Sequence, residues 1–211
     1  MTSGKGGLRM LGPLLWISPF AAPWKREMVE GLERQLRTEH PELYGDGFAG
    51  RLYMRPGRVE LDRGMGIFVR DGVEIPEGAL VGAYVGEVLD DMGGPYCFQL
   101  AAVRGHGRPE WIPVIDGRDA VYAGEEIQVA AYNHTCRRPT VRLVSFGVGP
   151  LKCKLAYATR RLRGNDELLF NYGPDYVCEN GDLVALRAEF PGARMCSCQD
   201  GQCPYRSVLK Y

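Results

Sequence analysis

The feature that most constrains the fold of this chain is a set of three cysteines close to its end. They follow a Cys-x-Cys-x4-Cys pattern formed by Cys196, Cys198 and Cys203. A structural zinc ion takes four ligands in a closed tetrahedral site, so three thiolates are one short. Cys136, about sixty residues upstream, is the candidate for the fourth ligand. We therefore expect one structural zinc ion that ties the end of the chain back to its middle.

The full cysteine inventory indicates a reducing environment. The chain has seven cysteines, an odd number with no even spacing, and this is not typical of a disulfide framework. A redox role is the alternative for the C-terminal set, but redox pairs use Cys-x-x-Cys spacing. Cys97 and Cys153 lie in apolar runs, so we expect both to pack as small hydrophobic side chains.

Composition narrows the class of protein. The chain has 211 residues, enough for one sizeable domain, and 45% hydrophobic and 25% charged residues are ordinary for a soluble globular protein. Lys and Arg together number 26, as do Asp and Glu together. Strong non-specific binding to nucleic acid needs a basic excess, so this balance argues against it. The short basic clusters at 137–138 and 160–163 are expected to be solvated loop charges or, alternatively, a local basic patch.

The first 23 residues show no periodicity. Residues 8–23 are apolar and follow Lys5, which faintly resembles a signal peptide. The segment contains Gly12, Pro13 and Pro19, and it is too short and too broken to span a membrane as a helix. We expect a packing arm or a flexible lead, with a signal peptide as the alternative.

An amphipathic helix is predicted over residues 24–39. Pro23 precedes this stretch and Pro41 follows it, as is typical at helix ends. Apolar side chains recur every four residues with charged residues between them, which gives one apolar stripe. The stripe consists of Trp24, Met28, Leu32 and Leu36.

From residue 51 onward the sequence changes to short β-rich runs separated by Gly, Pro and Asp. Such spacing predicts a mainly β fold of several small sheets. We expect a turn at 74–78, a helical turn within 125–132 and a short helix within 174–195. The predicted strands are 67–69, 80–84, 87–89, 96–100, 112–114, 141–146 and 154–158.

Four further motifs precede or separate the cysteines. They are Gly-Met-Gly at 64–66, Tyr-Val-Gly-Glu at 84–87, Asn-His-Thr-Cys at 133–136, and Glu-Leu-Leu-Phe-Asn-Tyr-Gly at 167–173. In this order, with the cysteine set, the chain resembles SET-domain protein lysine methyltransferases that carry a post-SET zinc tail. The resemblance covers roughly residues 57–211.

The resemblance implies a SET-type fold of small β-sheets with a pseudoknot-like C-terminal part. An N-terminal helix and a zinc-bound C-terminal tail are added to it. The implied organisation is an N-terminal arm and helix over 1–50, a SET domain over 51–176, and a linker with the zinc tail over 177–211. The zinc ligands would be Cys136, Cys196, Cys198 and Cys203.

The same resemblance assigns a cofactor site for S-adenosylmethionine. Its residues would be Gly64, Met65, Gly66, Asn133, His134 and Tyr172. Taken alone, Gly-Met-Gly is equally a tight turn before a strand, and a lone histidine is equally a structural residue. We expect His134 to orient its neighbours and not to act as a general base.

The implied catalytic residues are Tyr172, Tyr84 and Phe170. Together they would form a narrow aromatic channel for the lysine side chain. Desolvation there favours the neutral amine, whose ordinary pKa is about 10.4. Phe170 leaves more room than a hydrogen-bonding tyrosine, so we expect di- or trimethylation. An ordinary core strand is the alternative for Phe170 and Tyr172, and an ordinary strand tyrosine is the alternative for Tyr84.

The chain departs from the family pattern in three places. Met65 replaces an aromatic residue, Asn171 replaces Asp, and Ala130-Ala131-Tyr132 stand where the family has Arg-Phe-x before Asn133. The leading hypothesis is a methyltransferase of a histone tail in the nucleus or another reducing intracellular compartment. It would have no sequence-specific nucleic-acid contact and no membrane association. The alternatives are a catalytically weak interaction module and a methyltransferase of a non-histone protein.

Overall fold

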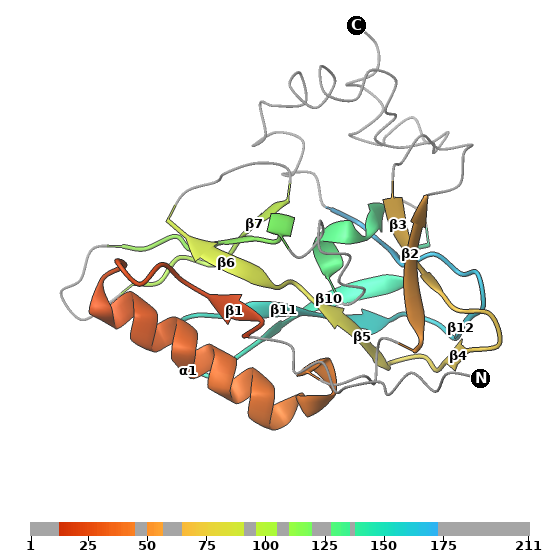
Figure 1. Ribbon diagram of the computed structural model, residues 1–211, viewed down its shortest axis with the longest axis horizontal. Helices are drawn as coiled ribbons and strands as arrows, with labels where there is room; N and C mark the ends of the chain where they lie inside the picture. Colours follow the sequence, from red (N-terminus) through yellow and green to blue (C-terminus); the bar gives the residue numbers. More distant parts are fainter. Residues whose placement is uncertain are drawn as a thin grey trace, which may run out of the picture.

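The computed structural model describes residues 13–44, 50–56, 65–90, 96–104, 110–119, 128–135 and 138–172. Within these residues the protein is mainly β, with several small sheets and one α-helix (Figure 1). The expected mainly β fold with small sheets and an N-terminal helix is thereby confirmed. The predicted zinc tail and the predicted helix within 174–195 lie outside the described residues.

The largest sheet joins the N-terminal arm to the middle of the chain. Its outermost strand β1 pairs in parallel with β6, and the remaining pairs are antiparallel. The strand order is β1 (Leu15–Trp16), β6 (Gly86–Leu89), β8 (Val114–Asp116) and β7 (Cys97–Gln99). Residues 15–16 of the arm are therefore packed into the sheet.

A second sheet of three antiparallel strands forms much of the core. It has the order β10 (Val141–Phe146), β11 (Cys153–Ala158) and β5 (Leu80–Ala83). β10 has the predicted bounds, and Cys153 on β11 is fully buried as a free thiol. The predicted packing role of Cys153 and Cys97 is confirmed, since Cys97 is also buried.

Among the described residues, three two-stranded pairs and two short 3₁₀ turns complete the fold. Pairs β2–β3 and β4–β12 are antiparallel, whereas β9–β13 is parallel. The 3₁₀ turns are η1 (Pro41–Tyr44) and η3 (Val129–Ala131). The paired strands are β2 (Leu52–Pro56), β3 (Met65–Val69), β4 (Glu74–Ile75), β12 (Leu162–Arg163), β9 (Asn133–His134) and β13 (Leu169–Phe170).

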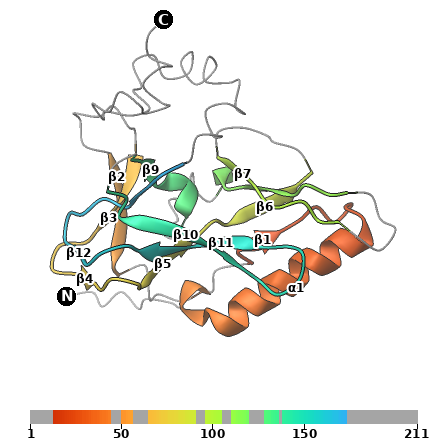
Figure 2. The same cartoon turned by 180° about the vertical axis from the view of Figure 1, so that it is seen from behind.

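Helix α1 (Pro23–Glu39) lies along one side of the molecule next to β1, and both ribbon views agree on this (Figures 1 and 2). Its fully packed apolar residues are Val29, Leu32 and Leu36. Trp24 and Met28, which the sequence placed on the buried stripe, are only partly buried. The buried face is thus rotated toward Val29 and Glu33, because β1 and η1 pack on that side.

Two predictions, one of a strand and one of a turn, need correction. The strand expected at 112–114 is found at Val114–Asp116. Pro113 has no N–H to donate, and Ile115 is the fully buried residue that faces the core, while Ile112 is 42% exposed. The stretch expected to be a turn at 74–78 begins with β4, because Ile75 pairs with Leu162.

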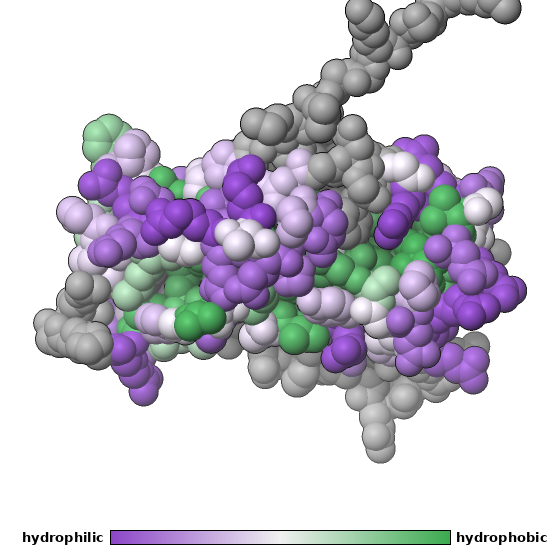
Figure 3. Space-filling model, turned by 90° about the horizontal axis from the view of Figure 1, so that it is seen from below, coloured by the Kyte–Doolittle hydropathy of each residue, from purple (hydrophilic) through white to green (hydrophobic). Residues whose placement is uncertain are grey.

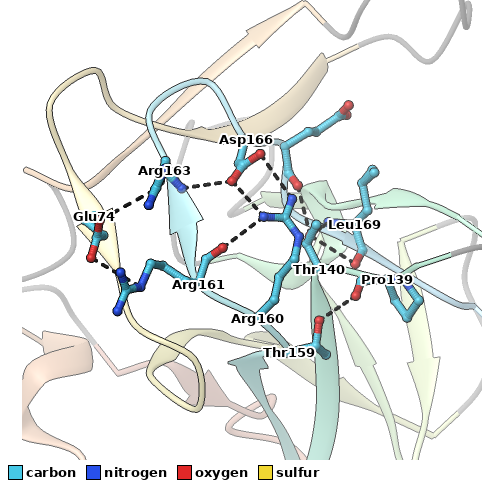
Figure 4. A network of polar contacts seen from close by, with 10 residues as sticks. Glu74, Pro139, Thr140, Thr159, Arg160, Arg161, Arg163, Asp166 and Leu169 are labelled. Carbon is cyan, nitrogen blue, oxygen red and sulfur yellow. Dashed lines mark hydrogen bonds and ion pairs between the residues drawn. The ribbon is translucent and has the colours of Figure 1, made fainter.

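An ion-pair network fixes the turn that leads into β13 (Figure 4). Arg160 makes a bidentate contact with Asp166, at 3.0 and 3.1 Å, and the Arg163 N–H also donates to Asp166 at 2.8 Å. Glu74 forms ion pairs with Arg161, which directly precedes the opposite strand β12, and with Arg163 in that strand. The basic cluster at 160–163 therefore has local acidic partners and rigidifies the chain just before Glu167.

The surface seen from below is mostly hydrophilic, with smaller hydrophobic patches between the polar side chains (Figure 3). Large exposed hydrophobic side chains among the described residues are Phe20, Ile112 and Val148. No helix within the described ranges is both long enough and apolar enough to cross a membrane.

Candidate functional site

Two distant motifs meet in the parallel pair β9–β13. Leu169 is in register with Asn133, and Phe170 with His134. The Thr135 N–H donates to the Phe170 carbonyl at 2.9 Å, which extends the pairing by one residue. The motifs at 133–136 and 167–173 are thus neighbours in space although more than thirty residues separate them in the chain.

Thr140 fixes the other side of the same segment. Its hydroxyl donates to the Glu167 carbonyl at 2.9 Å and accepts from the Leu169 N–H at 2.7 Å. The Leu168 N–H donates to the Ile67 carbonyl on β3. Residues 167–170 are therefore held between β3 and the 133–140 segment.

A polar pair links three of the motifs. Asn133 Nδ2 donates to Glu167 Oε1 at 2.7 Å, and the Glu167 side chain is 8% exposed. Gly66 lies directly against this pair: a Cβ on Gly66 would be 2.7 Å from both the Asn133 amide nitrogen and the Glu167 carboxylate oxygen. Any larger residue at 66 would break this contact, so the glycine is required by close approach and not by a turn.

The three expected catalytic residues surround one small pocket of about 50 Å³. Tyr84 follows β5, Phe170 ends β13, and Tyr172 lies two residues beyond it. The rings of Phe170 and Tyr172 are 4.7 Å apart, measured between their centroids. The lining residues are Tyr84, Cys97, Phe98, Val129, Ala130, Phe170 and Tyr172.

Backbone carbonyls fix both tyrosine hydroxyls of the pocket. Tyr84 Oη donates to the Tyr96 carbonyl at 2.9 Å, and Tyr172 Oη donates to the Tyr132 carbonyl at 2.7 Å. Tyr132 itself is fully buried and donates to the Val81 carbonyl at 2.7 Å. Burial raises the pKa of Tyr132 above its ordinary value, so this supporting phenol stays neutral.

Sequence reasoning missed several residues of the pocket region, among them Phe98 and Gln128. Phe98 packs on Tyr84 with ring centroids 5.0 Å apart and lines the pocket. Gln128 is fully buried, and its amide is bonded to Val85 and to the lining residue Ala130. Phe98 was visible only as one apolar residue of a predicted strand. For Gln128 the one available signal was a polar residue inside the apolar run that ends at Tyr132.

Several expected site residues are not among the residues, or the side chains, that the structure describes. Gly64, Cys136, Cys196, Cys198 and Cys203 lie outside the described residues, so the zinc set stays a prediction. Met65 and His134 are placed by their backbone in β3 and β9, and their side chains are not described.

Comparison with known proteins gives little more. No family model and no curated protein matches this sequence. Among solved structures, one similar chain comes from "Structure of ctPRC2 in complex with H3K27me3 and H3K27M". It is 19% identical, with a TM-score of 0.42. The likeness covers 58% of the present chain and 14% of that chain, so the present chain spans a small part of the length of its neighbour.

Proposed function

We propose that the protein is an S-adenosylmethionine-dependent protein lysine N-methyltransferase. The observation that carries the proposal is the convergence of separate motifs: Tyr84, Phe170 and Tyr172 line one pocket. The Asn133–Glu167 pair adjoins it through β9–β13, with Gly66 packed against the pair. The apolar aromatic lining suits the side chain of a lysine, and aromatic rings beside a buried carboxylate suit a sulfonium cofactor.

The residues near Gly66 fit the cofactor. S-adenosylmethionine would supply an electrophilic methyl group on a sulfonium. The absence of a Cβ at Gly66 lets the Asn133–Glu167 pair lie directly against the β3 backbone. The holding residues would be Gly64, Met65, Gly66, Asn133, His134 and Tyr172. Of these, Asn133 has its amide oriented by Glu167.

The pocket residues prepare the lysine amine. The amine must be neutral to attack, and the apolar lining of Phe98, Val129 and Phe170 disfavours the ammonium form. A tyrosine hydroxyl that donates to a carbonyl is fixed in direction, and its oxygen can still accept. Tyr84 and Tyr172 are both held in this way, so each can orient an amine or contact a polarised methyl group.

The proposed substrate is a lysine of a histone tail, and the proposed product is di- or trimethyllysine. The proposed location is the nucleus. A methyltransferase of a non-histone protein keeps the same chemistry. The second candidate is a catalytically weak interaction module, which is favoured by Ala130 on the pocket wall where the family pattern has arginine.

The decisive experiment is methyl transfer from S-adenosylmethionine onto a panel of histone and non-histone proteins, read by mass spectrometry. We expect lysine to gain the mass of one CH₂ group for each methyl group transferred. The matched control is Tyr172→Phe, which leaves the ring in place. Calorimetric titration with the cofactor separates the candidates. Binding without transfer to any panel member supports the weak module, and absence of both binding and transfer overturns the proposal.

The proposed zinc site has a separate test. We expect metal analysis to give about one zinc ion per chain, because four thiolates close the coordination sphere. Cys136→Ser should reduce zinc content and weaken folding, because the free energy of metal binding contributes to folding. Cys178→Ser is the matched control and should leave zinc content unchanged. Zinc content unaltered in Cys136→Ser would show that Cys136 is not a ligand.

A further inference from the structure

We propose that an arginine-rich surface, formed where the β2–β3 and β4–β12 pairs meet, binds the phosphate backbone of double-stranded DNA. This arginine surface consists of residues 51–53, 70–74 and 161–165. Binding of a duplex phosphate backbone is inferred from the surface itself. The choice of DNA as the duplex rests on the proposed function, because histones are bound to DNA.

Two arginines face each other at one end of the β2–β3 pair. The Arg70 N–H donates to the Arg51 carbonyl at 2.8 Å, and the next pair in register is Leu52 with Val69. Both arginines are exposed. Like charges directly opposite each other across an antiparallel pair destabilise that pair. Arg51 has no acidic partner among the described residues, so its positive charge is available to a ligand.

The second pair of arginines shares one carboxylate (Figure 4). Glu74 Oε1 lies 3.4 Å from Arg161 Nε, and Glu74 Oε2 lies 3.6 Å from Arg163 Nε. One negative charge cannot neutralise two guanidinium groups, and the two arginine side chains are 62% and 71% exposed. A guanidinium group has five N–H donors, so both arginines keep donors for a ligand.

The two arginine pairs lie on segments that touch each other. The Asn165 N–H donates to the Val69 carbonyl at 2.9 Å, and the Tyr53 hydroxyl donates to Asn165 Oδ1 at 3.0 Å. A Cβ on Gly164 would lie 3.0 Å from the Asp71 Cα. Both ribbon views place β2, β3, β4 and β12 at the same end of the molecule (Figures 1 and 2). The arginine surface is therefore continuous, and it sets four arginines against two carboxylates in a chain whose formal net charge is zero.

The residue types point to a chain of phosphates as the ligand. All four cations are arginines, whose planar forks bind phosphate oxygens in a bidentate manner. One phosphate group offers three strongly accepting oxygens, which two bidentate guanidinium groups already saturate. Arg161 and Arg163 are two residues apart on an extended segment, roughly 7 Å, so they reach different phosphates. Four arginines on two neighbouring segments therefore fit a polymer of phosphates better than a single phosphate group.

The arginine surface suits a duplex better than a single strand. Proteins bind single strands largely by stacking the bases on exposed aromatic rings. The aromatic residue of this surface is Tyr53, and its ring is already engaged. Its centroid lies 6.1 Å from that of Phe68, and the Arg70 Cζ lies 5.7 Å from it. A duplex is held through its phosphates and needs no such ring.

The arginine surface lies beside the candidate site and not within it. Arg70 directly follows β3, whereas Gly66, near the start of the same strand, contacts the Asn133–Glu167 pair. The four residues of extended strand between them span roughly 13 Å. DNA held at Arg70 would therefore leave the pocket open, and it would raise the local concentration of a histone bound to the same DNA.

The first test measures DNA binding directly. The full-length chain is titrated into a short labelled DNA duplex, and fluorescence anisotropy is followed at several salt concentrations. Because the chain has no net charge, we expect weak binding, with a Kd of roughly 1–100 µM, that weakens further as salt rises. Two duplexes of unrelated sequence should bind equally, because phosphate contacts carry no sequence information. Absence of binding at low salt would overturn the proposal.

Charge-removing variants locate the binding surface. Arg161→Ala combined with Arg163→Ala should weaken binding about tenfold and lower the slope of log K against log salt by about two. Arg51→Ala removes no described ion pair and should lower that slope by about one. Arg34→Ala combined with Arg104→Ala, two exposed arginines outside the arginine surface, is the matched control and should leave binding unchanged. Unchanged binding in the surface variants, or an equal loss in the control, would overturn the location.

Competition identifies the ligand class. Unlabelled duplex DNA should displace the labelled duplex more effectively than polyglutamate, single-stranded DNA, duplex RNA or vesicles that contain phosphatidylserine. Equal competition by polyglutamate would overturn the phosphate assignment, because it would show a general attraction to acidic polymers. Equal or better competition by single strands, duplex RNA or vesicles would overturn the choice of duplex DNA.

A second test joins the arginine surface to the proposed function. The kcat/KM for methyl transfer is measured on nucleosomes and on a free histone peptide. Arg161→Ala combined with Arg163→Ala should lower the nucleosome value several-fold and leave the peptide value unchanged, because neither side chain lines the pocket. An equal loss on both substrates would overturn the role in substrate binding.

The two proposals can fail separately. If the wild type transfers no methyl group but binds DNA through Arg51, Arg161 and Arg163, the proposed function fails and the DNA-binding surface stands. If the wild type transfers methyl groups but the surface variants bind DNA as the wild type does, the DNA-binding surface fails and the proposed function stands.

Discussion

The pocket and the α1 side of the molecule are stabilised in different ways. At the pocket, side-chain hydroxyls and an amide bond to backbone carbonyls and N–H groups, as in Tyr84, Tyr172 and Gln128. At α1, most of the contact is apolar, from Leu32 and Leu36. Directional hydrogen bonds thus fix the shape of the pocket, whereas the burial of apolar surface holds the helix in place.

Glu33 is the exception that ties the two sides together. This buried carboxylate on α1 accepts from the Leu15 N–H at 3.0 Å and pairs with Arg37 at 3.3 Å. Leu15 belongs to β1, which pairs with Gly86 on β6, two residues after Tyr84. Packing on α1 therefore supports the stability of the protein, whereas hydrogen bonds at the pocket determine the shape of the pocket. Changes in the two regions should therefore separate stability from activity.

The largest expected effect is on the helix side. Leu36→Ala removes a side chain that is 1% exposed, and we expect a loss of about 2–5 kcal/mol in the free energy of unfolding. Urea unfolding measures it. Arg34→Ala, on the exposed face, is the control and should change stability by less than about 0.5 kcal/mol. A Leu36→Ala protein that is as stable as the wild type would remove the distinction between the two regions.

At the pocket, Tyr172→Phe should change activity far more than stability. Loss of the hydroxyl at 2.7 Å from the Tyr132 carbonyl should lower methyl transfer about 100-fold, as for a lost polar group at a reacting centre. Cofactor affinity should stay near normal. Tyr53→Phe is the matched control, because it loses one hydrogen bond to Asn165 outside the pocket. Full turnover by Tyr172→Phe would mean that another group acts at the reacting centre.

A smaller effect is expected for Phe170→Tyr. A hydroxyl beside the Tyr172 ring adds one hydrogen-bonding group to the pocket, worth about 1 kcal/mol net. We expect the product to shift several-fold toward monomethyllysine, measured by mass spectrometry of a substrate peptide. Tyr157→Phe, outside the lining residues, should leave the product ratio unchanged. If the wild type already stops at monomethyllysine with excess cofactor, a group other than Phe170 narrows the pocket.

The smallest effect is a pH dependence on the helix side. Burial, with a further contribution from the Glu33 carboxylate, raises the pKa of the Cys153 thiol from about 9 to about 12. The unfolded thiol ionises first, so the folded state binds more protons in this window and its stability falls as pH rises. Between pH 9 and pH 10 we expect a loss of about 1 kcal/mol from this group.

Urea unfolding at pH 8, 9 and 10 measures this slope. Cys153→Val removes the titrating group and should make the dependence of stability on pH less steep. Burial also raises the pKa values of Tyr44 and Tyr132, so these two residues still lower stability at higher pH. A slope equal to that of the wild type in Cys153→Val would show that the thiol is not protected by burial.

The sequence alone predicted the elements with strong local signals. β10 has its predicted bounds, since four of its six residues are apolar and three of these are β-branched or aromatic. Helix α1 begins one residue before its predicted start and has the predicted end, because a four-residue period between two prolines leaves little choice. The motifs could likewise be recognised from their residue types. The fold brings several of their residues close together, among them Gly66, Asn133 and Phe170.

Only the tertiary structure decided which groups meet. Asn133 bonds to Glu167, 34 positions away, and no local pattern selects that partner. The buried face of α1 turned toward Val29 and Glu33 because β1 packs there. In the sequence, Gln128 is an ordinary polar residue. Only the structure shows that its amide is bonded to Val85, Gly117 and Ala130. Local preference is set by neighbours along the chain, whereas hydrogen-bond partners and pocket walls are set by long-range packing that sequence spacing does not encode.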